Sequence, residues 1–261
     1  MVLKSSEKKI LISRVDVLGV KVDDISFEKA VERILQLSQD GKRSHYVATV
    51  NSEFVMMARR NPDFHRILTN ADLSLADGAG VVFSKQILGG KVQDRITGVD
   101  LVEKLCQESA KKTIRVGFLG GFDDVANIVA KRQKNRNPDL KVVISQPGDP
   151  AIGYDLRLRK TLDAVGRIDI LFVAYGMGQQ EFWIKRNRLK GLDVGVFIGV
   201  GGAFDYLSSV KRRAPKFMQN IGLEWLWRLI LEPRRVRRMS VLPIFLFLVL
   251  RQYFSKNKTY N

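Results

Sequence analysis

The chain has 261 residues, and 44 Lys and Arg against 27 Asp and Glu give it a formal net charge of +17. Its 45% apolar and 27% charged residues are typical of a globular protein that can bury a full core. The sequence contains neither a low-complexity tract nor a recognisable internal repeat, in keeping with a globular protein. The positive charge predicts an anionic partner: nucleic acid, acidic lipid or a phosphorylated ligand.

The N-terminal residues carry charge but no long apolar run, because Arg14 interrupts the apolar stretch after four residues. We therefore expect no secretion signal and a cytoplasmic catalytic body. Cys106 is the single cysteine, so no intrachain disulfide can form. Its helical surroundings favour a buried, unreactive thiol.

The first part of the chain alternates extended runs with helical spacing of the apolar residues. Gly19 predicts a bend in the first extended run, and Asn51-Ser52 predicts a helix N-cap. The predicted elements are an extended run at 10–22, a helix at 26–39, a strand at 45–50, helices beginning near 53 and at 62, a strand at 73–76, and helices near 80–88 and 99–111.

From Arg115 onward the alternation becomes regular. Each strand is apolar on both faces, which indicates a parallel sheet covered by helices on both sides. Ligands of such sheets bind beyond the carboxyl ends of the strands, so the layout predicts an enzyme. The predicted strands are 116–121, 141–145, 169–176 and 194–202, and the predicted helices are 122–135, 155–165 and 179–190.

Residues 211–261 form a basic tail that carries a net +10 of the total charge. Aromatic and apolar residues lie among its basic ones, and an uncharged run follows at 239–250. This run has 12 residues, whereas spanning a membrane takes roughly 20. We expect the tail to lie on an anionic membrane, where each basic residue contributes about 1 kcal/mol. A nucleic-acid partner is not expected, because the apolar run would have no role on a polyanion in water.

Three polar residues follow or end strands where a ligand would bind. Asp77, between a strand and Gly78, is a candidate general base, although local chemistry alone favours a turn aspartate that hydrogen-bonds its own backbone. Thr49 and Asn51 alternate along one strand end and face the same way. They could hold a sugar or a phosphate, or only cap the following helix.

Two further candidates lie in loops. Arg95 could bind a diphosphate, or only pair with Asp94 or Asp100. Gln180 opens a helix beyond a sheet end and could meet a ligand, or be an ordinary first-turn residue beside Glu181, which complements the helix dipole.

The tail holds three candidate arginines. Arg228 could act on a phosphate, or belong to a solvated ion-paired stripe with Glu224 and Glu232 at helical spacing. Arg235 and Arg238 share a helix face that suits a phosphate, although solvated basic faces are common.

The sequence gives no support for a metal or a hydrolytic site. No Asp-x-Asp pair occurs, so the carboxylate clamp that many sugar-nucleotide enzymes use for a divalent metal is missing. The two histidines, His45 and His65, make no zinc set with one cysteine. His65 is expected to pack, and we expect neither a metal nor a cofactor.

These residues lie in blocks that resemble the WecG/TagA/CpsF glycosyltransferases of bacterial surface-polymer synthesis. The blocks follow one another over nearly the whole chain. They are VLGVKVD (17–23), TVNSEF (49–54), LADGAGVV (75–82), RITGVDL (95–101), GFLGG (117–121), GMGQQEFWI (176–184), GVGGAFDYLSS (199–209), KRRAP (211–215) and GLEWLWRLILEPRRVRR (222–238).

The resemblance implies a Rossmann-like α/β body over residues 1–210 and a basic helical appendage over 211–261 that contributes to the active site at the membrane. It implies a metal-independent, inverting transferase at the cytoplasmic face of the membrane. The enzyme would move a sugar, often of the N-acetylmannosamine type, from UDP to an undecaprenyl-diphosphate-linked acceptor.

The resemblance also implies roles for the candidate residues. Asp77 would be the base, and Thr49 and Asn51 would line the pocket near the sugar. The remaining residues would contact the donor or acceptor, or stabilise diphosphate charge in place of a metal. Arg95 and Gln180 would contact the donor or acceptor. The diphosphate charge would be stabilised by Arg228, Arg235 and Arg238.

The chain departs from the family at Gly178-Gln179, where Pro-Lys or Pro-Arg is usual, so one basic side chain near the donor is missing. An alternative from another class is a non-catalytic, nucleotide-responsive module that docks on acidic membrane. The donor and acceptor sugars are not fixed by the sequence. Apolar tail residues could equally cover a subunit interface, which leaves a homo-oligomer open.

Overall fold

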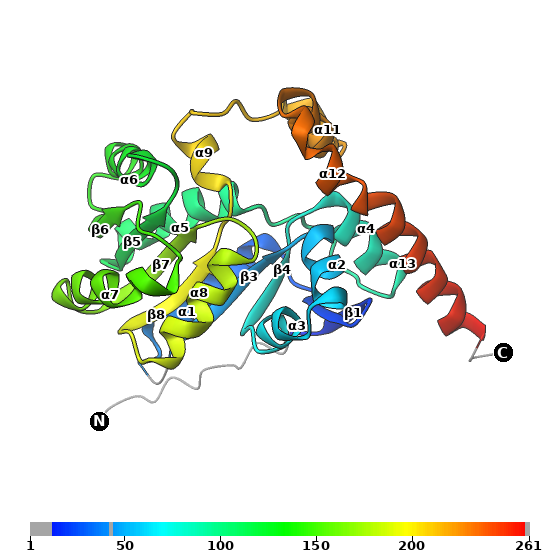
Figure 1. Cartoon of the computed structure of the whole chain (residues 1–261), viewed down its shortest axis with the longest axis horizontal. Helices are drawn as coiled ribbons and strands as arrows, with labels where there is room; N and C mark the ends of the chain where they lie inside the picture. Colours follow the sequence, from blue (N-terminus) through cyan, green and yellow to red (C-terminus); the bar gives the residue numbers. More distant parts are fainter. Residues whose placement is uncertain (1–11, 42–43, 259–261) are drawn as a thin grey trace.

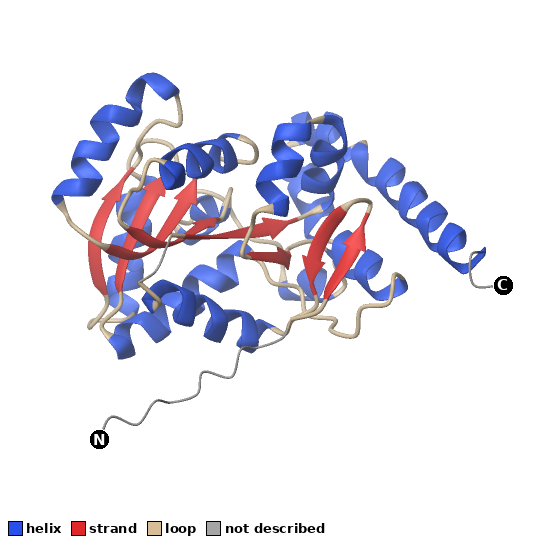
Figure 2. Cartoon of the chain, turned by 90° about the horizontal axis from the view of Figure 1, so that it is seen from below, coloured by secondary structure: helices blue, strands red, loops and turns tan. Residues whose placement is uncertain are grey.

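The protein, seen in a computed structural model that describes residues 12–41 and 44–258, is built on a six-stranded parallel sheet in the order β4-β3-β8-β7-β5-β6. Figure 2 shows these strands beside a separate antiparallel hairpin, β1 (Arg14–Val17) and β2 (Val20–Asp23). The strands of the main sheet are β3 (His45–Val50), β4 (Leu73–Ala76), β5 (Arg115–Gly120), β6 (Lys141–Gln146), β7 (Ile168–Ala174) and β8 (Val194–Gly199).

Helices cover both faces of this sheet (Figure 1). Helices α1, α5, α6 and α9 pack on one face, and α2, α3, α7 and α8 pack on the other. The bounds are α1 (Phe27–Gln39), α2 (Ser52–Arg60), α3 (Pro62–Thr69), α4 (Ala79–Ile87), α5 (Gly98–Lys112), α6 (Val125–Arg136), α7 (Asp155–Ala164), α8 (Gln179–Leu189) and α9 (Ala203–Leu207), with a 3₁₀ turn η1 (Ile152–Tyr154) before α7.

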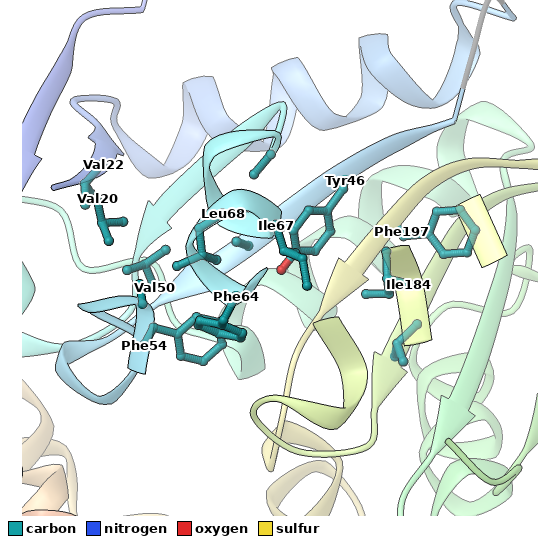
Figure 3. Packing of buried hydrophobic residues seen from close by; sticks show 14 of the residues in the cluster. Val20, Val22, Tyr46, Val50, Phe54, Phe64, Ile67, Leu68, Ile184 and Phe197 are labelled. Atoms are coloured by element: carbon teal, nitrogen blue, oxygen red, sulfur yellow. The ribbon is translucent and has the colours of Figure 1, made fainter. Parts of the chain in front are cut away.

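Successive residues of each strand feed two separate cores, which is why the strands are apolar on both faces. In β7, Ile170 belongs to one core and Leu171 to the other, and both are fully buried. Figure 3 shows part of the core that contains Leu171. In it, Phe64 and Leu68 of α3 lie close to Val50 of β3. The Rossmann-like parallel sheet expected from the sequence is confirmed.

The bend predicted at Gly19 is confirmed: the extended run forms a hairpin whose turn lies at Leu18 and Gly19, both at positive φ, and residues 10 and 11 lie outside the described chain. The end of the last strand differs from the prediction. The strand expected at 194–202 ends at Gly199. The next residues turn through Gly201, at φ 53°, into α9, which the sequence did not predict.

The tail folds into helices that pack against the body. They are α10 (Lys216–Asn220), α11 (Glu224–Leu231), a 3₁₀ turn η2 (Pro233–Arg235), α12 (Val236–Met239) and α13 (Val241–Lys258). In Figure 1, α13 runs past α4 and α2 and then away from the body. Within the described chain, no helix combines the length and apolarity needed to span a bilayer.

The apolar run at 239–250 has two sides. Phe245 and Val249 are fully buried in the core that α2 and α4 share, and Phe245 lies against Gly80. Ile244 and Phe247 are exposed by 47% and 65%. One side of the run is therefore used for packing, which the sequence analysis did not foresee, and only the other side is available to a membrane. The boundary between body and appendage at residue 210 stays a prediction.

Candidate active site

A cavity of about 600 Å³ lies at the carboxyl ends of the parallel strands, where ligands of such sheets bind. Residues that follow all six strands line it, from Asp77 after β4 to Gly148 and Pro150 after β6. Its wall is completed by the tail through Arg213 and Arg228. The body and the tail thus share one cavity.

Asp77 follows β4 directly, and its backbone N–H donates to the carbonyl of Val50, 2.9 Å away. No hydrogen bond joins its carboxylate to its own turn in the described part of the chain, so the turn-aspartate alternative is wrong. Burial raises the pKa of Asp77 to about 7, opposed by Arg228 and Arg95 and assisted by Glu224. A carboxyl with this pKa can accept and release a proton near neutral pH.

Thr49 and Asn51 both line the cavity, and both have structural partners. The Thr49 hydroxyl donates to the carbonyl of Gly199 at 2.9 Å, which ties β3 to β8. The Asn51 side-chain oxygen accepts from the N–H of Phe54 at 3.1 Å and caps α2, as one of the two alternatives predicted. Its side-chain NH₂ has no partner among the described residues and can donate to a ligand.

Gln180 is almost fully buried and joins two glycine turns of the cavity wall. Its amide nitrogen donates to Glu181 at 2.6 Å, and its oxygen accepts from the N–H of Gly201 at 2.9 Å. Glu181 in turn accepts from the N–H of Gly178 at 2.6 Å. Gln180 therefore positions the turns after β7 and β8. Burial raises the pKa of Glu181 to about 7, despite these hydrogen bonds.

Arg95 lies outside the large cavity and lines a smaller one of about 110 Å³ that also contains Asp77. Its guanidinium pairs with Glu224 of α11 at 2.9 Å. The predicted alternative partners are wrong. Asp94 accepts from the N–H of Phe27 at 2.8 Å, and Asp100 pairs with Arg213 at 2.7 Å.

Arg228 lines both cavities, and its guanidinium lies 4.9 Å from the centre of the Tyr206 ring. The predicted ion-paired stripe is wrong. Glu224 pairs with Arg95 and Arg213, and Glu232 pairs with Lys211 at 3.0 Å.

Arg238 also lines the large cavity, where it pairs with Glu53 at 2.7 Å and remains half exposed. Arg235 ends η2, and its side chain lies outside the described part of the structure.

Sequence reasoning missed Arg213, which connects the tail to the body at the cavity. Its guanidinium makes two hydrogen bonds to Asp100, at 2.7 and 3.0 Å, and a third to Glu224 at 3.2 Å. The signal was present in the KRRAP block, but an arginine in a basic run gives no indication of its partner.

Neither histidine belongs to the cavity. His65 contacts the carbonyl of Gly19 at 3.0 Å, and His45 lies between Asp40 and Asp72 at the start of β3. Among residues 12–41 and 44–258, no three His, Cys, Asp or Glu side chains are placed to hold a metal ion.

Comparisons with known proteins identify the family of the chain. A sequence model of the glycosyl transferase WecG/TagA/CpsF family matches residues 15–259. An N-acetylglucosaminyldiphosphoundecaprenol N-acetyl-β-D-mannosaminyltransferase of Bacillus spizizenii is 34% identical over 214 residues, 81% of each chain. The enzyme of that name from Staphylococcus aureus is 25% identical over 92% of this chain and 94% of its own. The chain therefore belongs to the WecG/TagA/CpsF family and is a glycosyltransferase.

Proposed function

We propose that the protein transfers a sugar of the N-acetylmannosamine type from a UDP-sugar to an undecaprenyl-diphosphate-linked sugar, with inversion and without a metal. The reaction would serve polysaccharide or teichoic acid synthesis at the cytoplasmic face of the membrane. The observation that carries the proposal is Asp77, whose pKa of about 7 suits a base and which borders two cavities beside Arg228. The names of the relatives support the choice of sugar and acceptor.

In the proposed mechanism, an acceptor hydroxyl attacks the anomeric carbon of the donor as Asp77 takes its proton. The bond from that carbon to the diphosphate oxygen breaks, and UDP leaves with the electron pair. Attack from the side opposite the leaving group inverts the anomeric centre. Asp77 returns its proton to solvent after product release, which its pKa permits.

Guanidinium groups would stabilise the negative charge that develops on the leaving diphosphate. Arg228 faces the large cavity without a carboxylate partner among the described residues, and Arg238 lies at the same cavity. Arginine binds phosphate oxygens through two parallel hydrogen bonds, and such charge-assisted bonds are about twice as strong as neutral ones. These guanidinium groups can supply the positive charge that a divalent cation supplies in other sugar-nucleotide enzymes.

The test is UDP release from a panel of UDP-sugars, with lipid-diphosphate-linked N-acetylglucosamine as acceptor and EDTA present. We expect acceptor-dependent release from one donor. Asp77→Asn should abolish turnover and leave UDP binding intact, whereas Asp63→Asn, an exposed aspartate on α3, should change nothing. Unchanged turnover in Asp77→Asn would remove the base from the mechanism. Binding without turnover across the panel would favour the non-catalytic docking module.

A further inference from the structure

Asp77 lies where two cavities meet. The cavity of about 600 Å³ and the cavity of about 110 Å³ share part of their lining. The shared residues are Asn51, Glu53, Asp77, Glu224 and Arg228. A base at such a junction can serve a reaction whose two substrates come from different sides.

The two cavities differ in size and in their walls. The large one runs along the strand ends and has the volume of an ordinary small-molecule site, about 300–1,000 Å³. The small one, at about 110 Å³, is too small for a nucleotide sugar. Its walls are the start of α4 and the side chains Trp225, Met239 and Leu242 of the tail. A nucleotide sugar therefore belongs in the large cavity.

Inversion demands that the two substrates meet from opposite sides of the anomeric carbon. With the donor in the large cavity, the attacking hydroxyl has to approach from the other side of Asp77. The small cavity lies on that side. Arg95 lines that cavity and not the large one, so it can meet a diphosphate attached to the incoming sugar.

Trp225 supplies the recognition surface of the small cavity. Its side chain lies on α11 and is 39% exposed, so one part of the indole packs and another part faces outward. The apolar C–H face of a pyranose can cover such a ring while the sugar hydroxyls stay hydrated.

The small cavity also leads toward an apolar surface. Leu242, in its wall, belongs to the first turn of α13, and Leu246 and Leu250, exposed by 38% and 43%, follow at i+4 and i+8 on the same face of the helix. A lipid chain attached to the sugar diphosphate can leave the cavity along these side chains. A water-soluble acceptor would gain nothing from this arrangement.

We propose that the small cavity is the subsite for the acceptor sugar, an N-acetylhexosamine linked through a diphosphate to a lipid, and that Trp225 is its platform. The inference rests on the proposed function and assigns the acceptor to one side of Asp77. Glu224 then holds Arg95 in place before the acceptor binds. Its ion pair with Arg95 has to weaken when the acceptor diphosphate binds that guanidinium.

The test measures binding by calorimetry with N-acetylglucosamine linked through a diphosphate to a short alkyl chain, in the presence of saturating UDP. The short chain removes any effect of Trp225 on membrane association. Trp225→Ala should raise the Kd of this acceptor about tenfold, the loss expected for one aromatic contact, and leave the Kd of UDP unchanged. Trp225→Phe should keep most of the affinity.

Ile230→Ala is the matched control, because Ile230 lies on the same helix, is 61% exposed and lines neither cavity. Acceptor binding by Trp225→Ala equal to that of the wild type would overturn the inference. An equal loss of UDP affinity would also overturn it, because Trp225 would then act on the donor side or on the fold. Failure of the proposed function has a separate signature: the wild type would bind this acceptor but transfer no sugar from any UDP donor.

Discussion

Replacing Asp77 with asparagine should stabilise the fold at neutral pH while it stops sugar transfer. Burial raises the pKa of this carboxyl from 3.8 to about 7 in the folded protein. The unfolded chain keeps the ordinary value. Between these two pH values the folded state therefore binds more protons than the unfolded state, and the free energy of unfolding falls as the pH rises. Asparagine has a similar shape and carries no proton to lose.

The magnitude follows from the difference between the two pKa values. A difference of about 3 corresponds to about 4 kcal/mol, which is an upper limit for the destabilisation caused by the ionised carboxylate. Because Asp77 lines two cavities that water can enter, screening by water reduces this, and we expect about 2 kcal/mol. The difference in free energy of unfolding between Asp77→Asn and the wild type should grow from about pH 4 to about pH 7 and stay constant above that.

The assay is urea unfolding of both proteins, followed by circular dichroism, at several values between about pH 4 and pH 8. We expect equal stability at the acidic end and a more stable variant at the other. A variant that is less stable than the wild type at neutral pH would refute the reasoning, and so would a difference that does not depend on pH. Either result would mean that the fold does not disfavour the charge on Asp77.

Three further predictions follow from contacts of the chain. Glu224→Gln removes a negative charge that raises the pKa of Asp77, so the acid limb of the kcat/KM profile should move to lower pH. Lys85→Met should destabilise the protein by about 3 kcal/mol in urea unfolding, because Lys85 is 1% exposed and its removal leaves Asp24 without its cation. An unchanged free energy of unfolding would contradict that. Cys106, fully buried and with its thiol pKa raised by burial, should react with thiol reagents only after unfolding. Labelling of the native protein would disprove its burial.

The sheet was predictable because each central strand is apolar on both faces and the intervening helices have clear spacing. The errors lie where the pattern is ambiguous. Val200 and the glycines after it continue the apolar run of β8, yet Gly201 adopts a positive φ that ends the strand. Helix α9 is only five residues long, too short for helical spacing to show.

The site was predictable in part, because the carboxyl ends of parallel strands meet at one edge of the sheet. Asp77, Thr49 and Asn51 could be placed together for that reason. The partners of charged residues could not, since an ion pair such as Arg95 with Glu224 depends on how the tail folds back. The same limit explains why Arg213 was missed.

The order of the strands places the two ends of the large cavity at opposite edges of the sheet. Asp77 follows the edge strand β4, near α13, whereas Gly148 and Pro150 follow β6 at the other edge (Figure 1). If α13 rests on lipid and the donor is a UDP-sugar, as proposed, then UDP can leave and a new donor can enter through the edge that faces water. One visit to the bilayer would then suffice for many rounds of transfer, and the lifetime of the docked state would set the yield per visit.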